Sequence, residues 1–94
     1  MLKLFKNVDE KLRDLGFLKI EDNEHLVEYT RFDDKYKFTQ RLAILYKESG
    51  KHIIQSYDKD LFDTKGIGNS CVGLTYQETK LALKKMKQKG WKSK

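Results

Sequence analysis

The sequence predicts a two-layer α+β domain, in which a four-stranded antiparallel meander sheet is flanked by an N-terminal and a C-terminal helix. Between residues 36 and 46 apolar side chains recur with a period of two, which indicates a strand with one face against a core. These positions are Tyr36, Phe38, Leu42, Ile44 and Tyr46. Ser49-Gly50 then supplies a turn before a second β-branched and aromatic run at residues 52–57. Helical spacing of apolar residues near both ends of the chain completes the pattern.

Length and composition indicate one domain that spans residues 1–94. Apolar residues make up 38% of the chain and charged residues 36%, but the regular apolar pattern argues against disorder. The single cysteine, Cys71, cannot form an intramolecular disulfide, which suits a reducing compartment. No stretch is apolar enough for a signal peptide or a membrane span, so we expect a cytoplasmic protein without a membrane partner.

The first predicted element is a helix over residues 3–15. Its apolar residues recur at spacings of three and four and form one stripe that should pack on the sheet. The stripe consists of Leu4, Phe5, Val8, Leu12 and Leu15. Gly16 follows at the position where a left-handed residue commonly ends a helix.

Four consecutive strands should follow, joined by short polar turns. They are predicted at residues 17–21, 25–32, 36–46 and 52–57. In the second strand Val27, Tyr29 and Arg31 would share one side. Short connections force neighbouring strands to be antiparallel, which makes the sheet a meander.

Residues 58–73 interrupt this regularity with three glycines and only scattered apolar residues. A connection of this length is usually functional or mobile, or contains a short element. The second helix should then begin at Thr75, because Thr75 and Glu78 have the spacing of a capping box. Its predicted apolar stripe is Thr79, Ala82, Leu83 and Met86, with Leu81 at the margin. Gly90 should end the helix and let Trp91 fold back onto the core.

The closing stretch from Leu74 to Trp91 is a capped, lysine-rich amphipathic helix that runs into Gly90-Trp91. It resembles the end of many small proteins carried by phages and prophages of Gram-positive bacteria, in which such a helix closes a small α/β domain. Residues 51–57 add to this resemblance, which covers about a quarter of the chain. The resemblance implies a phage-related setting, but it implies no activity and transfers no functional residues.

Catalytic and metal-binding patterns are weak. Cys71, His25 and His52 could serve as nucleophile and base only if the fold brought them together, and nothing in their spacing does so. One cysteine and two histidines fall short of a four-ligand zinc set. Asp58, Asp60 and Asp63 lack the calcium-loop pattern, since Phe62 occupies the third ligand position. We therefore expect no enzyme, no metal and no cofactor.

A glycine pair, Gly66 and Gly68, precedes the second helix and could approach a phosphate there. The third glycine of a nucleotide fingerprint is missing, and no Gly-Lys-Ser/Thr motif is present. Glycines that let a long loop turn back to the sheet explain the pattern more simply.

Positive charge is concentrated at the C-terminal end. Residues 80–94 hold seven lysines and no acid, whereas the rest of the chain holds 13 basic and 14 acidic residues, for a total of +6. These lysines could neutralise nucleic-acid phosphates, and Trp91 and the tyrosines could stack on exposed bases. The candidates are Lys80, Lys84, Lys85, Lys87 and Lys89. The run lacks arginine, and lysines also suit a helix C-terminus or a solvated face.

Two functions remain open at this point. The favoured one is a small non-enzymatic accessory or interaction domain that acts through a protein partner or as a homodimer. Its surface would be the outer sheet face with Ala43 and Leu45, together with the loop that contains Gly66 and Gly68. The alternative is a non-specific nucleic-acid-binding protein that uses the lysine-rich helix and tail, residues 75–94.

Overall fold

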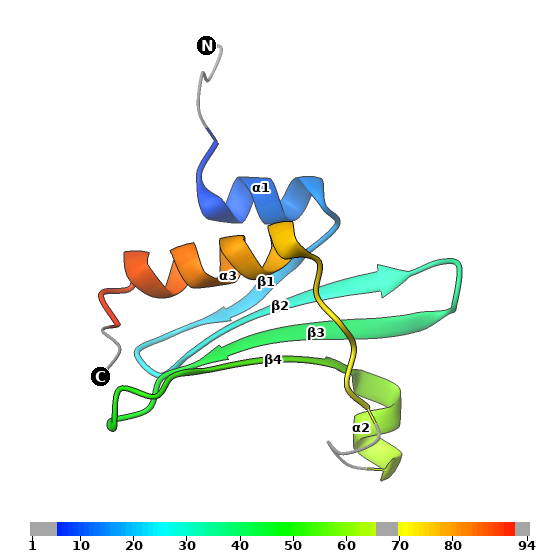
Figure 1. Ribbon diagram of the computed structural model, residues 1–94. Coiled ribbons are helices and arrows are strands. Elements are labelled where there is room, and N and C mark those ends of the chain that lie inside the picture. Colours follow the sequence, from blue (N-terminus) through cyan, green and yellow to red (C-terminus); the bar gives the residue numbers. More distant parts are fainter. Residues whose placement is uncertain (1–5, 66–69, 92–94) are drawn as a thin grey trace.

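A computed structural model describes residues 6–65 and 70–91. The elements are α1 (Val8–Asp14), β1 (Leu18–Asp22), β2 (Leu26–Asp33), β3 (Phe38–Leu45), β4 (Ile53–Asp58), α2 (Lys59–Lys65) and α3 (Tyr76–Gln88). The strands form one antiparallel sheet in the order β1-β2-β3-β4, with helices at both ends of the chain (Figure 1). The predicted α+β fold with a four-stranded meander is therefore confirmed.

The sheet has one face that is covered by helices and one that is mostly open. α1 and α3 lie side by side on the covered face, whereas α2 lies on the opposite side at the end of β4 (Figure 1). The core fills the space between the sheet and the helix pair. It consists of Val8, Leu12, Phe17, Val27, Tyr29, Leu42, Ile44, Leu81, Ala82, Met86 and Trp91.

Strand register explains which side chains enter this core. Tyr29 lies opposite Leu42, and Val27 lies opposite Ile44, so the alternating residues of β2 and β3 share the covered face. Tyr36 does not belong to this set, contrary to the sequence prediction. Its side chain is 69% exposed in the β2–β3 turn, where Lys37 adopts a left-handed φ of 56°. β3 accordingly begins at Phe38.

Both edges of the sheet are irregular. β1 has a bulge between Lys19 and Glu21, and all five of its residues are exposed. Beyond β4, the Asp58 amide donates to the Ser70 carbonyl, and the Val72 amide donates to the Ser56 carbonyl. The segment 70–72 therefore covers part of the β4 edge.

The N-terminal helix is shorter than predicted among the described residues. α1 begins at Val8 because the Asn7 side chain caps it and accepts the Glu10 amide at 2.8 Å. Leu4 and Phe5 lie outside the described residues. Gly16 has a φ of +96°, which confirms the predicted left-handed residue after this helix.

α2 occupies part of residues 58–73, for which the sequence predicted no regular element. The Asp58 carboxylate accepts the amides of Asp60 and Leu61, which stabilises the first turn of α2. Phe62 packs against Tyr57 on the open side of the sheet, with ring centroids 4.9 Å apart. The long connection therefore contains a short element. Its Gly66 and Gly68 lie outside the described residues.

α3 begins and ends as predicted, but it is rotated about its axis relative to the predicted stripe. The Thr75–Glu78 capping box is present, and Gly90, at φ +76°, lets Trp91 return to the core. Leu83 is 52% exposed, whereas Lys85 is only 8% exposed. The predicted inward position of Leu83 is therefore wrong. Ion pairs from the buried face of α3 to other elements account for this orientation.

Candidate nucleic-acid interface

The lysines of α3 divide into two groups. Residues 80, 84 and 87 project to solvent, whereas residues 85 and 89 project toward α1 and β1. Successive helical residues differ by about 100°, so adjacent lysines can face different surroundings. The two groups have different partners and are described in turn.

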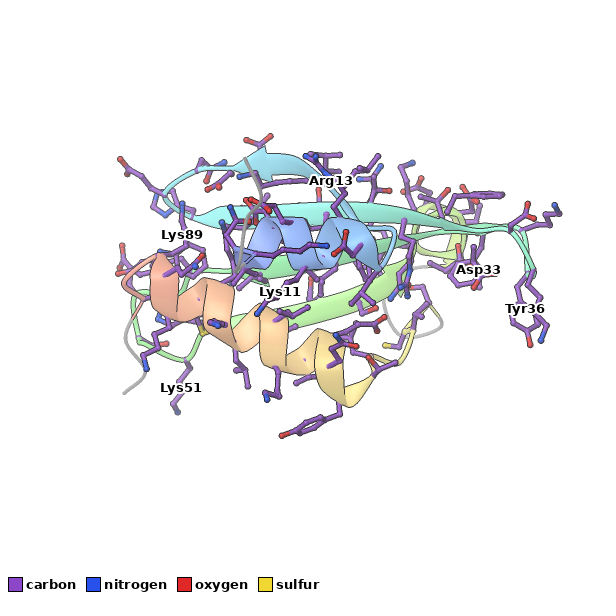
Figure 2. All side chains as sticks on the ribbon, turned by 90° about the horizontal axis from the view of Figure 1, so that it is seen from above. Lys11, Arg13, Asp33, Tyr36, Lys51 and Lys89 are labelled. Atoms are coloured by element: carbon purple, nitrogen blue, oxygen red, sulfur yellow. The ribbon has the colours of Figure 1, made fainter. Side chains whose placement is uncertain are left out.

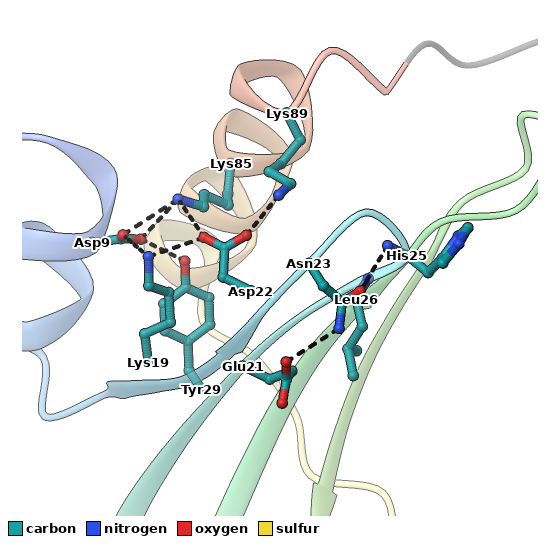
Figure 3. Close-up of polar contacts among 10 residues, drawn as sticks. All are labelled: Asp9, Lys19, Glu21, Asp22, Asn23, His25, Leu26, Tyr29, Lys85 and Lys89. Atoms are coloured by element: carbon teal, nitrogen blue, oxygen red, sulfur yellow. Dashed lines mark hydrogen bonds and ion pairs between the residues drawn. The ribbon is translucent and has the colours of Figure 1, made fainter.

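Asp9 of α1 is the centre of a polar cluster beneath α3. Its carboxylate accepts the Tyr29 hydroxyl at 2.6 Å and the Lys19 ammonium at 2.9 Å, and Lys85 Nζ lies 3.2 Å from Oδ1 (Figure 3). The donors come from β2, β1 and α3. One carboxylate thereby joins both helices to the sheet.

Asp22, at the end of β1, extends the same cluster. It accepts Lys89 Nζ at 2.6 Å and Lys19 Nζ at 3.0 Å, and Lys85 Nζ lies 3.9 Å away (Figure 3). The C-terminal turn of α3 is thus fastened to the β1–β2 connection. Together, Asp9, Lys19, Asp22, Tyr29, Lys85 and Lys89 are called the carboxylate cluster below.

The donors of the carboxylate cluster favour the ionised form of its two aspartates. Burial raises the pKa of Asp9, but hydrogen bonds from donors such as Tyr29 and Lys19 outweigh it and lower the pKa to about 2. The hydrogen bond from Lys89 lowers the pKa of Asp22. The hydrogen bond to Asp9 raises the pKa of Lys19. Burial raises the pKa of the Tyr29 hydroxyl most, and its hydrogen bond to Asp9 raises it further.

Three of the residues proposed from sequence to bind nucleic acid are engaged in the fold. Lys85 and Lys89 are ion-paired within the carboxylate cluster. Trp91 is only 9% exposed and packs against the rings of Tyr46 and His52 at centroid distances of 5.5 and 5.7 Å. Neither the ammonium groups nor the indole face is therefore available to a ligand in this conformation.

Two of the solvent-facing lysines, Lys80 and Lys84, border an open groove between α1 and α3, which has a volume of about 410 Å³. It is lined by Lys11, Tyr76, Gln77, Lys80, Leu81 and Lys84. Figure 2 shows Lys11 over the line where the two helices meet. No acid is present in the lining, and no ion pair joins Lys11, Lys80 or Lys84 to another described residue. This α1–α3 groove is therefore electropositive.

A second groove, along α1, differs in its charge. Its lining mixes Lys6 and Arg13 with Asp9, Glu10 and Asp14. Opposite charges at close range cancel much of each other's field, so this second groove offers no comparable attraction for a polyanion.

Of the lysines that line the α1–α3 groove, Lys80 and Lys84 were predicted from the sequence and Lys11 was not. Lys11 belongs to the other helix, and only the packing of α1 against α3 brings it to the same place. Tyr76 was predicted to lie at the start of the helix, and the tyrosines were proposed only as a group to stack on bases. Its high exposure follows from the rotation of α3, which helical periodicity alone predicted incorrectly.

The outer sheet face, predicted as a partner surface, carries both apolar and charged side chains. Leu45 is half-buried, and Ala43 lies on this face but is only 3% exposed. Beside Ala43, Glu28 pairs with Arg41 at 3.6 Å and accepts the Tyr57 hydroxyl at 3.0 Å. The exposed apolar side chains on this face include Ile53, which lies opposite Leu45, and Leu18 and Phe32 near the β1–β2 pairing.

The structure does not bring His25, His52 and Cys71 together. The two histidines flank the Tyr46 ring at centroid distances of 6.0 and 5.0 Å, next to the start of β4. Cys71 pairs with Tyr57 near the other end of β4, roughly 13 Å away at the usual rise per strand residue. Within residues 6–65 and 70–91, no group of three or more His, Cys, Asp or Glu could hold a metal ion.

Comparisons with known proteins provide no relative. The chain matches no family model, no curated protein and no solved structure. In the part of the chain that the structure describes, no helix has the length and apolar character needed to span a bilayer.

Proposed function

We propose that this protein is a non-enzymatic domain that binds nucleic acid without sequence specificity through the α1–α3 groove. The observation that carries the proposal is the lining of this groove, whose described residues include three lysines and no acid. Lys85 and Lys89 are neutralised by aspartates, so the unpaired positive charge lies on the solvent-facing side of α3.

Phosphate contacts, rather than base contacts, suit this groove. Lysine ammonium groups neutralise phosphates and release counterions, which supplies most of the affinity in non-specific binding. No arginine lines the groove, and bidentate base readout mainly uses arginine. The net charge of +6 would further attract a polyanion at a distance. Affinity should accordingly depend on salt and hardly on sequence.

Fluorescence anisotropy with labelled DNA tests this proposal. At about 50 mM salt we expect micromolar binding, and by about 200 mM most of it should be lost. Three contacts would give a log–log salt slope of about −3 on duplex DNA, or about −2 on a single strand. A variant with Lys80→Gln and Lys84→Gln should bind at least tenfold more weakly to every sequence tested.

The matched control removes two positive charges at a distance from the groove. Lys35 and Lys37 are exposed in the β2–β3 turn, where Lys37 pairs with Asp34. A variant with Lys35→Gln and Lys37→Gln changes the net charge equally and should retain most of the affinity. Equal losses in both variants would mean that total charge, not the groove, drives binding. Absence of binding at low salt would reject the function.

The phage-related setting and the cytoplasmic location remain predictions from sequence. A nucleic-acid-binding accessory protein would fit a phage genome, but the proposal depends only on the groove.

A protein partner is the second candidate, and a different observation favours it. Leu18 and Phe32 are 54% and 59% exposed on the outer sheet face. Exposed apolar side chains that gather on one face favour association, and a symmetric dimer is the commonest closed form. Light scattering of the wild type and of Phe32→Ser should then show a concentration-dependent dimer that the substitution weakens. A monomer at high micromolar concentration would reject a homodimer on this face.

A further inference from the structure

Tyr76 lies in the lining of the α1–α3 groove with its ring in solvent. It is 79% exposed, more than any other large hydrophobic side chain in the described ranges. Lys80 Nζ lies over the ring, 5.5 Å from its centroid. With this exposure, the ring retains open aromatic surface next to the groove lysines.

The backbone beneath this ring is fixed. Tyr76 is the first residue of α3 and directly follows the Thr75 N-cap. The Thr75 hydroxyl accepts the Glu78 amide at 3.1 Å, and the Glu78 carboxylate accepts the Thr75 amide at 3.0 Å. Glu78 is in turn paired with Arg31 at 2.9 Å. The ring is thus exposed on a well-anchored turn.

We propose that the ligand of the α1–α3 groove is single-stranded nucleic acid, with an unpaired base stacked on Tyr76. Lys11, Lys80 and Lys84 then contact the phosphates on either side of that base. This inference rests on the proposed function and assigns its substrate class. In a duplex the faces of each base are already covered by neighbouring bases, so an exposed ring has nothing to stack on.

Stacking on an aromatic ring tolerates every base, because each base has a π-face. It therefore adds affinity for unpaired strands without adding sequence preference. The combination of a positively charged groove and an exposed aromatic ring is the usual arrangement of proteins that bind single strands.

The chain contains a matched control for this ring. Tyr36 is 69% exposed, and Lys35 Nζ lies 5.1 Å from its ring centroid. It differs from Tyr76 in its surroundings, since it lies at the tip of the β2–β3 turn, away from α1 and α3 (Figure 2). Asp33 and Asp34 accompany it there. Only Tyr76 should therefore contribute to binding.

The test is an anisotropy titration of the full chain with four probes of equal length. The probes are labelled oligothymidine, oligouridine, a duplex and an abasic DNA strand. The wild type should bind oligothymidine and oligouridine about tenfold more tightly than the abasic strand, and more tightly than the duplex. Tyr76→Ala should lower the affinity for oligothymidine by about tenfold and leave that for the abasic strand unchanged. Tyr76→Phe should keep wild-type affinity, as should Tyr36→Ala.

The outcomes separate this inference from the function on which it rests. Equal binding of abasic strand and oligothymidine, or no effect of Tyr76→Ala, would overturn the stacking inference. If the Lys80/Lys84 variant still lost affinity in that case, the groove would bind phosphates alone and the proposed function would stand. Absence of binding to every probe at low salt would overturn both.

Discussion

The inner and outer faces of α3 place the same residue type in different surroundings. On the inner face, Lys85 is 8% exposed and lies between Asp9 and Asp22. On the outer face, Lys84 is exposed and lines a groove without acids. These two lysines are adjacent in the sequence, so their composition and charge context are nearly identical. The difference lies in the side chains that α1 and β1 bring to each face.

The role of each lysine in a charged helix therefore depends on the partners of its ammonium group, and the number of lysines alone does not predict it. Lysines that complete the carboxylate cluster should affect stability, and lysines in the α1–α3 groove should affect binding. Substitutions on each face can test whether the two roles are separate.

The largest effect should come from the centre of the carboxylate cluster. Asp9→Ala leaves the buried Tyr29 hydroxyl without its acceptor and removes the negative charge that pairs with Lys19 and Lys85. We expect a loss of about 3 kcal/mol in the free energy of unfolding, measured by urea denaturation. Asp14→Ala, on the same helix but exposed, should leave the denaturation midpoint nearly unchanged. Similar midpoints for both variants would mean that the cluster contributes little.

Low pH should lower the free energy of unfolding through the inner face of α3, within a defined pH range. Because the folded-state pKa of Asp9 is lowered to about 2, its stabilising effect is complete above about pH 5 and is lost as the pH falls toward 2. Asp9 alone should account for about 2 kcal/mol of this loss. Urea midpoints measured from pH 7 to pH 2.5 should fall in the wild type and fall less in Asp9→Asn. Parallel pH profiles would contradict the assignment.

Adjacent lysines give the most direct comparison. Lys85→Gln removes a partly buried ion pair with Asp9 and should cost about 1–2 kcal/mol in thermal or urea unfolding. Lys84→Gln should leave stability almost unchanged, because the side chain is exposed and has no ion pair among the described residues. If both substitutions destabilise equally, the rotation of α3 described above is incorrect.

The N-cap residue Thr75 supports both faces of α3, and its substitution should have the smallest effect on stability. Thr75→Ala removes the hydroxyl that accepts the Glu78 amide, which should cost about 1 kcal/mol. Thr75→Ser keeps this acceptor and should retain most of the stability in thermal melts. Unchanged melting of the alanine variant would show that the capping box is not needed to start α3.

Local sequence signals predicted the elements whose determinants lie close together in the chain. The Thr75–Glu78 capping box and the helix-ending Gly16 and Gly90 each depend on a few neighbouring residues, and all three are confirmed. The alternation in β2 and β3 likewise predicted the covered face. Tyr36 was wrongly assigned to the covered face, because it lies two positions before Phe38 and therefore continues the alternation although it belongs to the turn.

The candidate site depended on contacts between distant residues. Lys85 could not be recognised as buried, since its carboxylate partners are 76 and 63 residues away. Lys11 joins Lys80 and Lys84 only after both helices pack on the sheet. Helical periodicity favoured Leu83 as an inward residue because it counts apolar side chains and cannot foresee a paired lysine in the core.

The irregular edges of the sheet have a consequence for behaviour at high concentration. Cross-β fibrils grow when a free, regular strand edge pairs with the same edge of another molecule. A strand added at β1 would meet the bulge at Lys19–Glu21, which disrupts the spacing of donors and acceptors. A strand added along β4 would meet the segment 70–72, which already occupies part of that edge. Concentrated solutions of the folded protein should therefore resist fibril formation by edge addition, even though apolar side chains remain exposed on the open face.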